Sequence, residues 1–411
     1  MSDAPYEFLT PETTAAYIKS VPKIADKIDA DDIVSVEEVG DGNLNLVFII
    51  KDGAGRGVVL KQALPYVRLV GPDWPMTPDR ARHEAEALRQ HSDLVPEFVV
   101  DLYSYDGERY LMAMEDLSDH MVWRGALNEG LRHDGAAAAM GKYVGAVAFG
   151  TSCLGMERTD LAKRLAASVN PDLCTITEDL VFTEPYVDAG RNSVLAANER
   201  DARELADDDV MVAEMGQAKW TFMTRAEALI HGDLHTGSVM VKTDDPSGSG
   251  EASSVKAFDP EFAFYGPVSF DLGALYANYL IAAARAHALN NGEHMRWALE
   301  LPEQTWAAFE SEFRQKWPSR VDPRVYRDDL LESLLARWRT EAWAFGAAKM
   351  ARRIVGLAKT TDIETLDESV REGAARAVLQ AARLMVRERH NNSDPARLIE
   401  IVGNVFDQVG S

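Results

Sequence analysis

Two short acidic segments, joined by a polar connection, constrain most strongly how this chain can fold. The first is His231-Gly-Asp-Leu-His-Thr-Gly-Ser238, which follows a helical pattern over residues 221–230. The second is Asp259-Pro-Glu261, which ends a short apolar run. Residues 244–254 are rich in Gly, Ser and Asp, so they predict a flexible connection between two strands. The pattern therefore places the first segment on a loop and the second at the end of the next hairpin.

Each acidic segment also has a simpler explanation. A lone His-x-Asp is most often a loop whose Asp caps a turn, and a lone Asp-Pro-Glu is usually a surface turn. The alternation of His231, Asp233 and His235 would also suit a zinc site. Zinc would not explain the second acidic segment or the glycine-rich turn near the N-terminus, so chemistry that uses both segments is the stronger prediction.

Length and charge narrow the possible classes of protein. With 411 residues the chain exceeds what one core normally covers, so two lobes are expected. The 43 basic and 66 acidic residues give a net charge of −23, which argues against nucleic acid or an anionic membrane as partner. The N-terminus has no signal-peptide pattern, and the two cysteines imply no disulfide framework. We therefore expect a soluble, cytoplasmic protein.

The order of predicted elements indicates an α+β protein with two lobes. Strands are predicted at 33–39, 44–50, 58–63, 97–104 and 109–115, with a loop over 64–79 and a helix from Thr77-Pro78-Asp79 to about His91. Helical patterns then dominate over residues 134–230, 271–290, 303–316, 326–358 and 364–388. A small β-rich lobe with one helix (residues 1–116) and a large, mainly helical lobe (117–411) is the layout of the bilobal protein-kinase-like fold.

The first lobe contains residues suited to binding a nucleotide. Glycines let a backbone approach phosphate oxygens closely, and the first turn supplies the candidates Gly40, Gly42, Asn43 and Asn45. Lys61 interrupts an apolar strand, where a kinase needs a cation for the ATP phosphates. Its acidic partner on the next helix is expected to be Glu84, with Glu86 as the alternative.

Three further groups of residues complete the predicted chemistry. Met114, Glu115 and Asp116 close the first lobe, where the connecting segment of a kinase lines the adenine pocket. In the second lobe, Asp233 would accept or orient the proton of a substrate hydroxyl. Asp259 and Glu261 flank Pro260 on a segment predicted to be extended. They would then point to the same side and share Mg²⁺.

These motifs together resemble the bacterial and plant 5-methylthioribose kinase family. The similarity lies in residues 231–238 and 259–267 and, in the first lobe, in 40–45, 61–66 and 114–117. Residues 70–75 resemble the tryptophan-bearing loop of that family, and 351–358 resemble its arginine-pair segment.

The resemblance implies an activity, cofactors and further site residues. ATP, with Mg²⁺, would phosphorylate the anomeric hydroxyl of 5-methylthioribose to give 5-methylthioribose 1-phosphate in methionine salvage, and the protein would be a homodimer. Arg352 and Arg353 would stabilise the transferring phosphoryl group or hold the sugar, and Trp74 would close over the nucleotide. Without the resemblance, the arginines would be interpreted as an exposed basic pair and Trp74 as a loop residue covering the core.

Two other functions stay open. Aminoglycoside, choline or homoserine kinases share the fold, but the first two usually carry Asn at the position of Ser238 and no Glu at that of Glu261. Because serine is a poor metal ligand, Glu261 is expected to replace that ligand, which favours the narrower family. A non-catalytic kinase-like binding protein would be expected to lack Lys61, Asp233 or Asp259, and all three are present.

Overall fold

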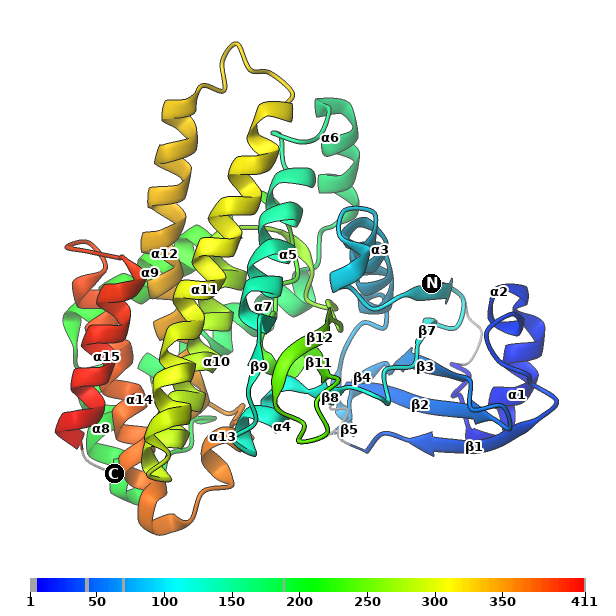
Figure 1. Ribbon diagram of the computed structural model, residues 1–411, viewed down its shortest axis with the longest axis horizontal. Helices are drawn as coiled ribbons and strands as arrows, with labels where there is room; N and C mark the ends of the chain where they lie inside the picture. Colours follow the sequence, from blue (N-terminus) through cyan, green and yellow to red (C-terminus); the bar gives the residue numbers. More distant parts are fainter. Residues whose placement is uncertain (1–5, 41–43, 69–70, 188, 410–411) are drawn as a thin grey trace. The chain divides into compact units, whose positions relative to one another are not determined.

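The computed structural model describes residues 6–40, 44–68, 71–187 and 189–409 (Figure 1). The chain forms two compact units, each described by itself below. Unit 1 comprises Met1–Asp119 and the short segment Phe258–Phe262, and unit 2 comprises His120–Ala257 and Ala263–Ser411. The sequence-based division assigned the second acidic segment to the C-terminal lobe, whereas its contacts place it in unit 1.

Unit 1 is built on an antiparallel sheet of order β1-β2-β3-β7-β6. The strands are β1 (Ile33–Glu38), β2 (Asn45–Asp52), β3 (Gly57–Ala63), β6 (Leu102–Asp106) and β7 (Leu111–Glu115). Alternate residues such as Phe48 and Ile50 of β2 pack on one face against Ile18 and Ile24, which belong to α1 (Pro11–Ser20) and α2 (Pro22–Ala25). Leu60 shares this core, so the next residue of β3, Lys61, points to the opposite face.

Unit 1 differs from the sequence prediction in several details. The predicted loop over 64–79 contains the strand pair β4 (Tyr66–Val67) and β5 (Gly71–Pro75). Helix α3 (Arg80–Ser92) begins after the expected start at Pro78, because Pro78 and Asp79 form a turn, and Thr77 Oγ1 accepts from the Asp79 amide at 3.2 Å. The predicted strand at 97–104 is a 3-10 turn (Pro96–Phe98) followed by β6. Unit 1 therefore holds more than the one helix expected.

Unit 2 is mainly helical and includes the long helices α10, α11, α12 and α14 (Figure 1). Its helices are α4 (Trp123–Asn128), α5 (Ala136–Gly150), α6 (Arg158–Ala167), α7 (Pro171–Leu180), α8 (Glu199–Ala206), α9 (Asp209–Thr224), α10 (Val268–Ala288), α11 (Gly292–Lys316), α12 (Asp328–Ile354), α13 (Thr361–Glu364), α14 (Glu368–Glu388) and α15 (Pro395–Val409). Single 3-10 turns lie at Glu184–Tyr186, Ala196–Asn198, Thr236–Ser238 and Trp317–Ser319. Within the described ranges, no helix is long and apolar enough to cross a membrane.

Short strands of unit 2 surround the first acidic segment. The antiparallel pair β11 (Val239–Thr243) and β12 (Gly250–Ala257) lies in a sheet with β8 (Met121–Val122) and β9 (His133–Asp134), and β10 (Ala228–Ile230) pairs with β13 (Phe264–Gly266). The helical pattern predicted over 221–230 is wrong at its end, because residues 228–230 are held as a strand by β13. Helix α11 also starts earlier than predicted and continues through Pro302.

Candidate active site

In unit 1, strand β3 and helix α3 bring a buried lysine and a buried glutamate together. Nζ of Lys61 lies 2.7 Å from both carboxylate oxygens of Glu84. The two side chains are 7% and 1% exposed. Glu86 instead pairs with Arg82 at 3.2 Å near the surface. Glu84, not Glu86, is therefore the helix acid that faces Lys61.

The second acidic segment adds two carboxylates to this pair. Asp259 forms an ion pair with Lys61, and ligand oxygens of Glu84, Asp259 and Glu261 lie within 4.8 Å of one another. The expected extended segment is wrong at Asp259, whose φ of 66° lies in the left-handed region. That conformation is unfavourable for a non-glycine residue and is most often found at functional sites. A turn, rather than the alternation of a strand, brings these carboxylates together.

Arg80, which the sequence analysis missed, fixes Glu261. Its side chain is fully buried, with Nε 3.2 Å from Oε2 of Glu261 and Nη2 3.2 Å from Oδ1 of Asn45. Asn45 in turn donates from Nδ2 to Glu261 at 3.1 Å. An arginine in the first turn of a polar helix normally faces solvent, so the sequence offered little signal for this role.

The acids of this cluster outnumber its two cations. Burial and the charges of Asp259 and Glu261 raise the pKa of Glu84 to about 8, although Lys61 opposes the shift. Burial and Asp259 likewise raise the pKa of Glu261. Burial alone would lower the pKa of Lys61, but Asp259 and Glu84 outweigh it and raise that pKa. The raised pKa values indicate that the three crowded carboxyl groups repel one another when ionised, and a hard divalent cation bound by their oxygen atoms would relieve that repulsion.

The other predicted residues of unit 1 that the structure describes lie in or next to its strands. Gly40 follows β1, whereas Gly42 and Asn43 lie outside the described residues. Met114 is buried and Glu115 half-buried at the end of β7, and Trp74 is half-buried in β5.

Asp116, next along the chain, pairs with Lys51 and accepts from the Ser118 amide at 2.9 Å. A Cβ on Gly57 would lie 1.9 Å from its carboxylate, so a larger residue there would require the Asp116 side chain to shift.

In unit 2, backbone hydrogen bonds hold the first acidic segment in place. Asp271, in the first turn of α10, accepts from the amides of His231 at 2.8 Å and Gly232 at 3.1 Å. Gly232 has a φ of 81°, a conformation that favours glycine. Ser238 Oγ lies 3.1 Å from the Asp233 carbonyl oxygen, which it can bond as donor, and 3.1 Å from Nδ1 of His235.

Asp233 is surrounded by cations from helix α12. Nζ of Lys349, a side chain only 3% exposed in all, donates to Oδ1 of Asp233 at 2.6 Å. Nε2 of His235 lies 3.4 Å from Oδ2. Burial acts to raise the pKa of Asp233, but Lys349, His235 and Arg352 hold it well below its usual range. Asp233 is therefore an ionised carboxylate at neutral pH.

Arg352 and Arg353 are buried near the same carboxylate rather than exposed at a helix end. Each is 9% exposed, which rules out the simpler interpretation of this pair. Burial lowers the pKa of Arg352, and Asp233 opposes that shift. Arg124 of α4 acts electrostatically on both arginines; it contacts Asn278 at 2.9 Å and Asp362 at 3.2 Å.

Lys349 and Arg124 are functional candidates that the sequence analysis missed. Lys349 interrupts a run of apolar residues, 344–351, and a charge in an apolar segment was the signal that singled out Lys61. The same reasoning could therefore have found it. No comparable local signal marks Arg124.

The zinc alternative does not fit this geometry. Among the residues that the structure describes, the group that could hold a metal is Glu84, Asp259 and Glu261. The carboxylate of Asp233 faces the ammonium group of Lys349, where a metal ion would be repelled.

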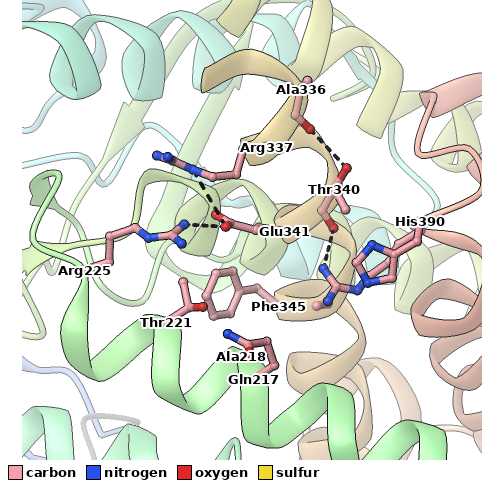
Figure 2. A pocket seen from close by; sticks show the side chains of 12 residues that line it. Gln217, Ala218, Thr221, Arg225, Ala336, Arg337, Thr340, Glu341, Phe345 and His390 are labelled. Carbon is pink, nitrogen blue, oxygen red and sulfur yellow. Dashed lines mark hydrogen bonds and ion pairs between the residues drawn. The ribbon is translucent and has the colours of Figure 1, made fainter. Parts of the chain in front are cut away.

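A separate cavity of about 430 Å³ lies between α9 and α12 (Figure 2). Figure 2 shows Gln217 and Thr221 on one side and Thr340 and Phe345 on the other. Its three arginines are already paired with carboxylates: Arg225 with Glu341, Arg337 with Glu227 and Arg389 with Glu214. None of the predicted site residues lines this cavity, so it is not the candidate active site.

The comparisons with known proteins agree with this chemistry. Residues 35–301 match the model of the phosphotransferase enzyme family. A solved structure of choline kinase from Cryptosporidium parvum aligns over 97% of this chain and 100% of its own, with 12% identity and a TM-score of 0.49. The chain is thus a phosphotransferase of the α+β, protein-kinase-like class.

Closer relatives define the family. A methylthioribose kinase 1 from Oryza sativa subsp. japonica is 36% identical, over 96% of this chain and 93% of its own length. The methylthioribose kinase of Geobacillus kaustophilus is 38% identical over 87% of each chain, and that of Pectobacterium atrosepticum is 38% identical over 86% of this chain and 88% of its own. The chain belongs to the methylthioribose kinase family.

Proposed function

We propose that this enzyme transfers the γ-phosphoryl group of ATP to the anomeric hydroxyl of 5-methylthioribose, as a step of methionine salvage. Family membership supports the substrate. The observation that carries the reaction type is the buried cluster of Lys61, Glu84, Asp259 and Glu261, which combines a phosphate-binding cation with carboxylates for a metal ion.

Unit 1 is the proposed binding site of ATP. Lys61, oriented by Glu84, would contact the ATP phosphates, and Gly40, Gly42 and Asn43, which the sequence predicts to form a turn, would supply backbone amides. Adenine would lie against Met114, Glu115 and Asp116. Because Asn45 is engaged by Glu261 and Arg80, it would help to position the metal-binding carboxylate.

Asp259 and Glu261 are the proposed ligands of Mg²⁺, with Glu84 close by. The residues fit such an ion, because their oxygen donors converge and the crowding of their carboxyl groups raises the pKa of Glu84. Mg²⁺ would neutralise charge on the ATP phosphates. Arg80 and Asn45 hold Glu261, and the buried Pro260 restricts the backbone between the two ligands.

The sugar is assigned to the Asp233 cluster of unit 2. The ionised carboxylate would accept a hydrogen bond from the attacking hydroxyl and so orient it. The hydroxyl oxygen bonds to the γ-phosphorus as the bond to the bridging oxygen breaks, and the proton passes to Asp233. Arg352 and Arg353 would stabilise the negative charge of the transferring group.

An assay with alternative acceptors tests this function. ADP release is measured with methylthioribose, ribose, choline and kanamycin, each with ATP and Mg²⁺. We expect turnover with methylthioribose at the highest kcat/KM. A preference for choline or kanamycin would favour another small-molecule kinase of this fold, and no turnover with any acceptor would favour a binding protein. The homodimer, the cytoplasmic location and the role of Trp74 as a lid stay predictions.

A further inference from the structure

Lys349 has no role in the chemistry described so far, yet it makes the shortest contact that any described residue makes with the Asp233 carboxylate. It lies on α12, one turn before Arg353, in a helix segment whose neighbours Ala347, Ala348 and Met350 are fully buried. Its Nζ also lies 4.7 Å from the ring centroid of Phe270. A buried ammonium group is costly unless it is paired, so its presence here calls for an explanation.

The surroundings of Lys349 make a purely structural role a poor explanation. The charged groups that act most strongly on Lys349 are Asp233, Arg352 and Arg353. Lys349 also interacts electrostatically with Asp271. Two guanidinium groups close to a buried lysine are repulsive, whereas a neutral side chain would pack without that cost. The one strong compensation is the contact with Oδ1 of Asp233 at 2.6 Å.

The two carboxylate oxygens of Asp233 have different contacts. Oδ1 is occupied by the ammonium group, while the contact of Oδ2 with His235 is long, at 3.4 Å. Burial lowers the pKa of His235 to about 3, so its ring is neutral and competes weakly for the carboxylate. Oδ2 is therefore the oxygen with capacity to accept a further hydrogen bond.

We propose that Lys349 is a positioning residue for phosphoryl transfer: its ammonium group fixes Oδ1 of Asp233 and keeps the carboxylate ionised, so that Oδ2 is presented to the attacking hydroxyl. This inference rests on the proposed function, because it assumes that Asp233 receives the hydroxyl. Asp233 then orients the hydroxyl first and takes its proton only as the new O–P bond forms, since a strongly stabilised carboxylate is a weak base.

The pH dependence of kcat gives a readout that a structural role would not change. Burial lowers the pKa of Lys349 to about 8, with Asp233 opposing the shift. The ammonium group is therefore present below that pH and is lost above it, so kcat of the native enzyme should fall on the alkaline side near pH 8. In Lys349→Arg the charge persists to far higher pH, and this alkaline decline should move upward by more than about one pH unit.

A double-mutant cycle separates positioning from folding. Lys349→Met should lower kcat about 100-fold, because a misplaced catalytic group costs that much, and should leave KM for ATP unchanged. The single variant Lys349→Met leaves Asp233 buried without its cation. The double variant, which combines Asp233→Asn with Lys349→Met, therefore serves as a second test. Its residual rate should equal that of Asp233→Asn alone. Lys219→Met, which removes a half-buried lysine bonded to Thr183 at 2.8 Å, is the matched control and should keep native kinetics.

Three results would overturn the inference: near-native kcat in Lys349→Met, an alkaline decline that Lys349→Arg leaves in place, or an equal loss from Lys349→Met with and without Asp233. The native enzyme is assayed with methylthioribose first. Absence of that turnover would refute the proposed function itself, and is thereby distinguished from failure of the role of Lys349.

Discussion

The two buried clusters have opposite electrostatic character. In unit 1, three carboxylates surround Lys61 and Arg80, and the pKa values of Glu84 and Glu261 are raised. In unit 2, Asp233 is held by Lys349 near Arg352 and Arg353, and its pKa is lowered. The crowded carboxyl groups of the first cluster offer oxygen ligands to a metal ion, and the cations of the second cluster could bind an anionic group. A protein with a net charge of −23 thus keeps a local excess of cations where the phosphoryl group is proposed to arrive.

The largest expected effect comes from the acid of the cation-rich cluster. Asp233→Asn should reduce kcat by about 1,000-fold or more, because an amide cannot accept the hydroxyl proton. The variant should stay folded, since an amide oxygen can still accept from Lys349. Steady-state kinetics with saturating ATP and methylthioribose provide the measurement, and retention of most of the native rate would remove Asp233 from the mechanism.

A smaller effect is expected from the acid-rich cluster. Glu261→Ala should raise the Mg²⁺ concentration needed for half-maximal turnover by about 10-fold or more, because an anionic oxygen ligand is lost and Arg80 is left unpaired. Ser238→Ala, which removes only a hydroxyl bonded within its own loop, is the comparison variant. If the Ser238 change were the more damaging one, the proposed exchange of metal ligands would be wrong.

Arg352→Ala and Arg353→Ala test whether the excess of cations acts on the reaction. Each is expected to lower kcat by about 10- to 100-fold while changing KM for ATP less, as for a guanidinium that acts mainly on the transition state. Both constants are measured for ATP and for the sugar. Near-normal kinetics in both variants would leave the arginines with a structural role only.

The smallest effect should come from an acid that has cationic neighbours but no part in the chemistry. Asp208 caps α9, with Oδ1 3.1 Å from the Val210 amide, and pairs with Arg383 at 2.9 Å and Arg387 at 2.7 Å. Burial acts to raise its pKa, but these arginines lower it to about 2. Asp208→Asn should cost about 1–2 kcal/mol of unfolding free energy at pH 7 and leave kcat unchanged.

The loss of unfolding free energy in Asp208→Asn should depend on pH, because the pKa of Asp208 is lowered in the folded state. A carboxylate whose pKa is lower in the folded state contributes stability above its unfolded pKa, near 3.8, and loses it as the pH falls toward about 2. Urea unfolding of both proteins should therefore converge at the acid end. A difference that persists unchanged there would assign the effect of Asp208 to packing instead.

The sequence predicted which charged residues of unit 1 come together better than it predicted the local backbone geometry. Lys61 and Glu84 were identifiable because a charge within an apolar strand needs a partner on the next helix. The left-handed turn at Asp259 and the role of Arg80 depend on contacts between distant residues, such as Arg80 with Glu261, which no local pattern encodes. The strand at 228–230 was missed for the same reason, because pairing with β13 decides its conformation.

Unit 2 shows where sequence reasoning could have gone further. The motif around Asp233 was recognisable, and the resemblance to a family directed attention to Arg352 and Arg353. Lys349 lay in the same segment and carried the same signal as Lys61, but helix periodicity alone could not show that it faces Asp233.

Calorimetric titration tests most directly whether the two clusters have the separate roles assigned to them. ATP is titrated, with and without Mg²⁺, into one variant of the unit 1 cluster and one variant of the unit 2 cluster. We expect Asp233→Asn to bind ATP with Mg²⁺ at close to the native Kd, whereas Glu261→Ala should lose most of the increase in ATP affinity that Mg²⁺ provides. Equal weakening in both variants, or weakening confined to Asp233→Asn, would contradict the assignment of the metal and nucleotide to unit 1 and the acceptor to unit 2.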